Sequence, residues 1–401
     1  MRALIADEFS QRHLDSLRGL GLTVEYRPGA KADELPALAA EVGILVVRST
    51  EVKAEVFEKA RALSLVIRAG AGVNTIDTAA ASARGVYVAN CPGQNAIAVA
   101  ELTLGLMLAA DRHIPENVQA LREGRWNKKR FSQARGLYGR TLGVVGLGAI
   151  GAAVAHRARA LGMRVVACSL GLRPEDARRQ GLEHAGTPLE LARQCDVLTV
   201  HVPGGADNKG LVSRAVLAAL PDGALFINTA RADVVDQAAL LEEAKAGRLR
   251  VALDVHQDEP KGGEAAWVSP LAQLPNVYGT HHIGASTDQA QEAIADEAVR
   301  IVDSFLSRGE VPNCVNVARK TLARYQLIVR HLDKVGVLAN VLGELREAGI
   351  NAQELENTIF EGSTAACCKI QLDSRPSEDV LKRIAGRPQE VIFVDLVELR
   401  P

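Results

Sequence analysis

Residues 141–151 form a short apolar run that ends in Gly146, Gly148 and Gly151, which is the spacing G-x-G-x-x-G. In such a turn the first glycine allows a tight reversal, the second lets the backbone approach a pyrophosphate, and the third lets a helix lie close against the strand. The alanine-rich residues 152–161 favour that helix, whose first N–H groups would point at the phosphates. The stretch therefore predicts a dinucleotide site. An ordinary glycine turn is the alternative, because glycine makes up 35 of the 401 residues.

The charge balance argues against nucleic acid or an acidic membrane surface as a partner, since 47 basic residues stand against 48 acidic ones. The six cysteines lack the paired C-x-x-C spacing of zinc sites, so we expect reduced thiols, no metal and no disulfide framework. We find no signal-peptide pattern at the N-terminus and no apolar run of the roughly 18 residues that a membrane span needs. We therefore expect a cytoplasmic protein that acts on a small molecule.

Short apolar runs alternate with helix-like segments over most of the chain, which is typical of parallel sheets with helices on both faces. In residues 1–95 the predicted strands are 3–6, 23–26, 44–47, 65–67 and 86–89. From the glycine turn onward they are 142–145, 165–168, 197–200, 224–227, 251–253 and 277–279. We thus expect an α/β protein with two doubly wound parallel-sheet domains, a flavodoxin-like substrate domain and a Rossmann cofactor domain.

Two long helices and a different tail complete the predicted organisation. The helix at 96–110 is apolar over most of its circumference, and an amphipathic helix at 286–310 could return the chain to the first domain. The tail predicts the order βαββαβ of a ferredoxin-like module, with strands 325–331, 357–361, 365–372 and 390–396 and helices 334–348 and 377–384. The expected domains are 1–95 with 286–315 for substrate, 96–285 for the dinucleotide, and 322–401 for the tail.

Polar residues follow three successive strands of the second predicted sheet, where parallel folds bind ligands. They include Arg231, Glu259 and either His281 or His282, between which spacing does not decide. A histidine can take a hydroxyl proton as a hydride leaves. A nearby carboxylate fixes the tautomer of the histidine and raises its pKa. An arginine offers two parallel N–H donors to the carboxylate of a substrate. Each residue alone is more often structural, but their joint placement favours hydride transfer at a 2-hydroxy acid.

The chain resembles the D-2-hydroxyacid dehydrogenase family over nearly its whole length, most closely the branch with a C-terminal ACT domain that oxidises 3-phospho-D-glycerate. The stretches that carry the resemblance are 68–73, 95–102, 124–131, 142–151, 228–231, 252–260 and 282–287. The resemblance implies the first reaction of serine biosynthesis, with NAD as cofactor. It further implies a homodimer or homotetramer, with Lys128 able to reach a neighbouring subunit's site.

The resemblance also implies the roles of individual residues. The catalytic residues would be Arg231, Glu259 and His282, because His282 directly precedes Ile-Gly-Ala. Substrate anions would bind at Arg48, Ser49, Arg68, Gly70 and Lys128. The cofactor residues would be Gly146, Gly148, Ala149, Ile150, Gly151, Ser169, Val202, Pro203, Thr229, Ala230, Asp254, Gly284 and Ala285, with Asp254 on the nicotinamide amide. An amino-acid effector of the ACT domain would meet His331, Asp333 and Asn351.

Three positions depart from the family pattern. Ser169 stands where an acid usually bonds the adenosine ribose, with Arg173 four residues on, so NADP is an alternative to NAD. Ala232 replaces a glycine after the expected catalytic arginine, and Asp333 stands where serine-inhibited members carry an amide. Two other functions stay open: a glyoxylate or hydroxypyruvate reductase with the same three catalytic residues, and a dinucleotide-sensing regulator without catalysis.

Overall fold

Five short apolar strands near the N-terminus form one parallel sheet in the computed structural model, which describes residues 1–260, 264–318 and 321–399. The strands are β1 (Arg2–Ile5), β2 (Thr23–Tyr26), β3 (Ile44–Val47), β4 (Leu65–Arg68) and β5 (Tyr87–Asn90). Their order is β2-β1-β3-β4-β5, and every pairing is parallel, which confirms the flavodoxin-like prediction.

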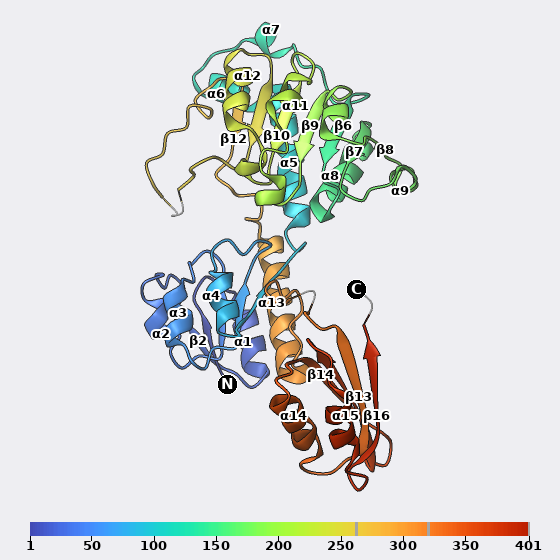
Figure 1. Cartoon of the computed structure of the whole chain (residues 1–401). Coiled ribbons are helices and arrows are strands. Elements are labelled where there is room, and N and C mark those ends of the chain that lie inside the picture. The colour runs from blue at the N-terminus through green and yellow to red at the C-terminus, as the bar shows by residue number, and fades with distance from the viewer. Residues whose placement is uncertain (261–263, 319–320, 400–401) are drawn as a thin grey trace. The chain divides into compact units, whose positions relative to one another are not determined.

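Helices cover both faces of this sheet because alternate strand residues point to opposite sides. One face packs against α1 (Gln11–Gly19) and α13 (Asp288–Arg308) (Figure 1). The other packs against α2 (Leu35–Leu38), α3 (Ala54–Lys59) and α4 (Thr78–Ala83). The long helix α13, expected from its amphipathic pattern, therefore returns to a sheet formed at the other end of the sequence.

The second parallel sheet contains the glycine turn. Its strands are β6 (Thr141–Val145), β7 (Arg164–Cys168), β8 (Glu183–His184), β9 (Val197–Val200), β10 (Leu225–Asn228), β11 (Arg250–Leu253) and β12 (Val277–Gly279). Their order is β12-β11-β10-β9-β6-β7-β8, so the strand order reverses between β6 and β9 as in a Rossmann fold. The sequence predicted six strands here. It missed β8, an edge strand of two residues without an apolar run.

Two sets of helices cover the second sheet. Helices α5 (Ala96–Arg112), α8 (Ala149–Ala160) and α9 (Pro174–Arg179) pack on one face. The other face carries α10 (Pro188–Ala192), α11 (Arg214–Ala218) and α12 (Gln237–Lys245). Shorter elements are α6 (Ile114–Arg122), α7 (Lys128–Phe131), and the 3₁₀ turns η1 (Ala206–Asn208) and η2 (Ala232–Val234).

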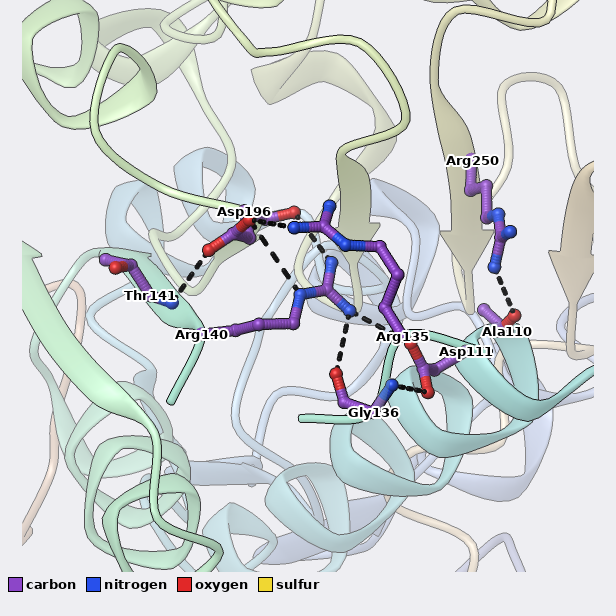
Figure 2. A network of polar contacts seen from close by, with 8 residues as sticks. All are labelled: Ala110, Asp111, Arg135, Gly136, Arg140, Thr141, Asp196 and Arg250. Atoms are coloured by element: carbon purple, nitrogen blue, oxygen red, sulfur yellow. Dashed lines mark hydrogen bonds and ion pairs between the residues drawn. The ribbon is translucent and has the colours of Figure 1, made fainter. Parts of the chain in front are cut away.

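A buried ion network fixes the start of β6 (Figure 2). Arg140 donates to Asp111 at the end of α5 at 2.9 Å, and both side chains are almost fully buried. Asp196, just before β9, accepts from the backbone of Thr141 at 3.0 Å and from Arg135 at 2.9 Å. Burial lowers the pKa of Arg140 most, and the charge of Arg135 lowers it further, against the opposing effect of the two carboxylates. The strand that leads into the glycine turn is thereby tied to α5 and to β9.

The chain divides by its contacts into two compact units, Met1–Asn316 and Val317–Pro401. The second unit contains β13 (Tyr325–Leu332), α14 (Val337–Glu347), β14 (Ala352–Ile359), β15 (Ala365–Leu372), α15 (Glu378–Ala385) and β16 (Val391–Glu398). Its antiparallel sheet has the order β14-β15-β13-β16, which confirms the ferredoxin-like prediction. Among the described residues of both units, no helix is both long and apolar enough to cross a membrane.

Candidate active site

The three glycines of the turn each meet a different steric condition. Gly146 has φ 90°, and a Cβ there would lie 2.7 Å from the carbonyl oxygen of His201. A Cβ on Gly151 would lie 2.0 Å from the carbonyl oxygen of Gly146, so only glycine lets α8 approach the strand this closely. A Cβ added to Gly148 would meet nothing within 4 Å, and this glycine is the N-cap residue of α8. The exposed backbone at Gly148 and Ala149 thus has the room and the free N–H groups that a pyrophosphate requires.

The other residues predicted for the cofactor lie around the carboxyl ends of the same strands. Ile150 is half-buried at the start of α8, Ser169 directly follows β7, and Val202 and Pro203 follow β9. A Cβ on Gly146 would lie 2.8 Å from a methyl of Val202. Thr229 is buried with its hydroxyl 3.0 Å from that of Thr103 on α5, and Ala230 donates its N–H to Asn228 at 2.9 Å. These positions form one edge of the sheet.

The guanidinium of Arg173 is engaged by a neighbouring carboxylate. Its Nε donates to Asp176 at 2.9 Å, and Arg179 bonds the same carboxylate. Hydrogen bonds from the two arginines lower the pKa of Asp176 to about 2, so this carboxylate is charged at neutral pH. Asp176 therefore opposes the positive charge that Arg173 would otherwise offer to an anion.

Glu259 and His282 come together from the loops after two adjacent parallel strands, β11 and β12. The Nδ1 atom of His282 lies 2.5 Å from Oε1 of Glu259, and the second carboxylate oxygen accepts the N–H of His256 at 3.0 Å. Burial raises the pKa of Glu259, but the hydrogen bonds from His282 and His256 outweigh it and leave the pKa below its ordinary value. Of the two candidate histidines, His282 is the one whose ring meets the carboxylate.

Asp254 anchors the loop that carries His282. Its carboxylate is buried and accepts the hydroxyl of Thr280 at 2.6 Å, the N–H of Ile283 at 2.8 Å and the N–H of Gly284 at 2.9 Å. A Cβ on Gly284 would lie 2.9 Å from that carboxylate, so the contact depends on glycine. Asp254, Gly284 and the half-buried Ala285 were all predicted to contact the cofactor, and the hydrogen bonds of Asp254 tie it to the loop that contains the other two residues and His282.

Three arginines gather at the ends of β3, β4 and β10. The Nε of Arg68 donates to the carbonyl of Arg48 at 3.0 Å, and its guanidinium lies against Gly70, where a Cβ would be 2.1 Å away. A Cβ on Gly72, in the same loop, would lie 3.1 Å from a guanidinium nitrogen of Arg231. Burial lowers the pKa of Arg68 most, and the charges of Arg231 and Arg48 lower it further. The cluster has the chemistry of an anion site.

Asp7 also belongs to this part of the site, although the sequence analysis did not select it. One oxygen of its carboxylate accepts the N–H groups of Arg48 at 2.6 Å, Ser49 at 3.2 Å and Thr50 at 3.2 Å. Asp7 follows the first predicted strand directly, so its position at a carboxyl end was the available signal. Since Asp7 occupies these three amides, a substrate anion at this loop would be bound by the arginine side chains.

Direct bonds do not join all of the predicted catalytic residues in the described part of the chain. In the part of the chain that the structure describes, no hydrogen bond or ion pair joins Arg231 to Glu259 or His282. Lys128 is exposed at the start of α7, and Ser132 bonds its carbonyl.

The three effector residues lie in the second unit. His331 is buried, with Nδ1 2.8 Å from the carbonyl of Leu332 and Nε2 3.1 Å from Asn357, while Asp333 and Asn351 are exposed. His331 pairs with Ala366 on β15, whereas Asn351 lies beside Asp373 beyond its other end. One unit therefore does not bring these two residues together.

The chain is similar to known proteins in sequence. Residues 104–284 match the family "D-isomer specific 2-hydroxyacid dehydrogenase, NAD binding domain". The chain is 36% identical over 374 residues to a D-3-phosphoglycerate dehydrogenase of Methanocaldococcus jannaschii, covering 91% of this chain and 68% of the relative. It is 40% identical over 275 residues to a hydroxypyruvate reductase of Thermotoga maritima, covering 67% of this chain and 86% of the relative.

The fold has solved counterparts as well. The crystal structure of the TT0316 protein from Thermus thermophilus superimposes with a TM-score of 0.70 and 34% identity, covering 79% of this chain and all of that one. The chain spans 64–68% of the length of three D-3-phosphoglycerate dehydrogenases that it matches.

Proposed function

The chain belongs to the D-2-hydroxyacid dehydrogenase family, and we propose that it oxidises 3-phospho-D-glycerate to 3-phosphohydroxypyruvate with NAD, the first step of L-serine biosynthesis. The observation that carries the substrate is the cluster of Arg48, Arg68 and Arg231, in which burial, and then the charges of Arg231 and Arg48, lower the pKa of Arg68. A substrate with both a phosphate and a carboxylate relieves that repulsion better than one with a carboxylate alone.

His282 is the acid–base group in this proposal. Its Nδ1 faces Glu259, so Nε2 is the atom that takes the proton from the C2 hydroxyl as the C2–H bond breaks. Bound NAD supplies the hydride acceptor. The ionised carboxylate of Glu259 stabilises the imidazolium that forms and keeps the ring in one tautomer. Arg231 binds the substrate carboxylate and polarises the C2 oxygen, while Arg48 and Arg68 hold the remaining anionic group.

The open backbone at Gly148 and the free first turn of α8 support a bound dinucleotide. NAD rather than NADP fits the contacts of Arg173, because its guanidinium is bonded to Asp176 and the carboxylate opposes its positive charge. Ser169 would bond the ribose hydroxyls in place of the usual acid, and Asp254 would contact the nicotinamide amide.

A hydroxypyruvate or glyoxylate reductase is the second candidate, which the likeness to the Thermotoga maritima protein favours. Both activities use the same histidine, glutamate and arginine. They differ in whether a phosphate contributes to binding.

The ACT module, the oligomer and the location are part of the same proposal. His331 and Asn351 lie at opposite ends of β15, so an effector site that used both would need two copies of the module. We propose a homodimer or homotetramer in which paired modules bind an amino acid, with Asp333 at the site and Lys128 reaching the neighbouring subunit. Six free thiols suit the reducing cytoplasm.

An assay of cofactor oxidation tests the function. The purified protein is given 3-phosphohydroxypyruvate, hydroxypyruvate, glyoxylate or 2-oxoglutarate with NADH or NADPH. We expect the highest kcat/KM for 3-phosphohydroxypyruvate with NADH. Equal kcat/KM for hydroxypyruvate would favour the second candidate, and no oxidation with any substrate would contradict both.

A further inference from the structure

His256 lies between Asp254 and Glu259 in the loop after β11, and it makes contacts that the reaction described above does not use. Its backbone N–H donates to Oε2 of Glu259 at 3.0 Å. Its ring Nε2 lies 2.9 Å from the carbonyl oxygen of Thr280, in the loop that carries His282. From this geometry we infer that His256 is a positioning residue that holds the Glu259–His282 pair in register. The inference rests on the proposed function.

The ring of His256 has a fixed orientation. A carbonyl oxygen only accepts, so Nε2 must carry a hydrogen and donate it to Thr280. The ring of Trp267 meets it edge-on at 5.0 Å between centroids, and Trp267 itself donates to the carbonyl of Asp258 at 3.1 Å. A Cβ on Gly279 would lie 3.4 Å from Cε1 of the imidazole, so the ring rests closely over that glycine.

Both loops that His256 connects contain a residue with positive φ. Asp258 has φ 55° and His282 has φ 54°, in the left-handed region that side chains other than glycine rarely adopt. Thr280 makes two of these hydrogen bonds: its hydroxyl donates to Asp254, and its carbonyl accepts from His256. Glu259 is likewise shared between His282 and His256. His256 is thus bonded both to the carboxylate and to the loop of the acid–base histidine.

Two substitutions separate the hydrogen bond from the packing of the ring. His256→Phe keeps an aromatic ring against Trp267 and Gly279 but removes the donor to Thr280. His256→Gln carries an amide N–H at about the position of Nε2 and restores that donor. His156→Phe, at an exposed position on α8, controls for a histidine-to-phenylalanine change elsewhere.

We expect His256→Phe to lower kcat about tenfold, because small misplacements of a catalytic pair are costly, while KM for substrate and for NADH changes less than about twofold. His256→Gln should recover most of the loss, and His156→Phe should match the wild type. Hydrogen–deuterium exchange of the free protein should show faster exchange at Ile283 and Gly284 in His256→Phe than in His256→Gln.

Wild-type kcat and exchange rates in His256→Phe would overturn the inference, as would a loss in His256→Gln equal to that in His256→Phe. The exchange measurement uses no substrate. If the wild type turned over no 2-oxo acid, the proposed function would fail, and the exchange comparison would still decide the role of His256.

Discussion

Burial and hydrogen bonding act in opposite directions on the pKa of Glu259, and hydrogen bonding prevails. A carboxyl group with a lowered folded-state pKa stabilises the folded protein above its unfolded pKa, and this contribution is lost as pH falls through the lowered value. Glu259→Gln should therefore be less stable than the wild type at neutral pH, and the difference should shrink below about pH 4.5. Urea unfolding at several pH values measures this, with the exposed Glu58→Gln as control. A difference that does not change with pH would contradict the assignment.

Asp176 sets the local charge next to the position of the adenosine ribose. Because it is bonded to Arg173 and Arg179, its removal should free a guanidinium for a 2′-phosphate. Because charge contacts at an exposed site are weak, Asp176→Ala should raise the ratio of kcat/KM for NADPH over NADH by no more than about fivefold. Asp33→Ala, at an exposed turn before α2, should leave the ratio unchanged. An unchanged ratio in Asp176→Ala would show that Arg173 does not reach the cofactor.

The sequence predicted the residues at the strand ends of the site, but it did not predict His256. Five site residues come after predicted strands, so their position near strand ends could be read from the sequence: Arg48, Arg68, Arg231, Glu259 and His282. The choice of His282 over His281 depended on resemblance, because both histidines follow the same strand. The role of His256 was not predicted, since its contacts depend on Thr280, Trp267 and Gly279, which lie 11 to 24 positions further along the chain.

At the scale of elements, the close approach of α8 to β6 depends on the absence of a Cβ at Gly151. Gly151→Ala would place a Cβ 2.0 Å from the carbonyl oxygen of Gly146, so the helix must move away and take its N-terminal amides with it. We expect NADH binding to weaken at least about tenfold, since those amides hold the pyrophosphate. Fluorescence titration of NADH measures the change.

Gly105→Ala is the matched control for this prediction. Gly105 also lies in a helix, α5, but a Cβ there meets nothing within 4 Å. The substitution should stabilise the protein by about 0.5–1 kcal/mol through helix propensity and leave NADH binding unchanged. Equal effects of the two substitutions on binding would contradict the steric account of the turn.

The strands that were predicted poorly are the polar edge strands β8 and β14. Strands β3 and β9 are fully buried, and their bounds match the prediction. The sequence placed a tail strand at 357–361, whereas β14 spans Ala352–Ile359 and is mostly exposed. Backbone pairing with β15 holds this polar edge strand, so its side chains carry no alternating pattern that could reveal it.

At the scale of the molecule, the first compact unit contains the two parallel sheets, and the second contains the antiparallel sheet with a core of its own. We propose that domain functions follow the expected division, with 1–95 and 286–315 for substrate, 96–285 for the dinucleotide and 322–401 for regulation. A protein of residues 1–316 should then fold and keep most of its turnover, because all the residues proposed for catalysis precede position 317. It should lose any change of rate that L-serine or another amino acid causes in the full chain. Loss of turnover in a folded 1–316 protein would contradict this division.

The central claim is that His282, held by the carboxylate of Glu259, accepts the proton of the C2 hydroxyl while a hydride leaves C2 of a phosphorylated 2-hydroxy acid. Its most direct test follows deuterium from C2 of 3-phospho-D-glycerate into the reduced cofactor, in the wild type and in His282→Asn. We expect labelled NADH from the wild type, and turnover at least about 1,000-fold slower in the variant, with unchanged NADH affinity. Unlabelled NADH from the wild type, or turnover in His282→Asn within tenfold of the wild type, would contradict the claim.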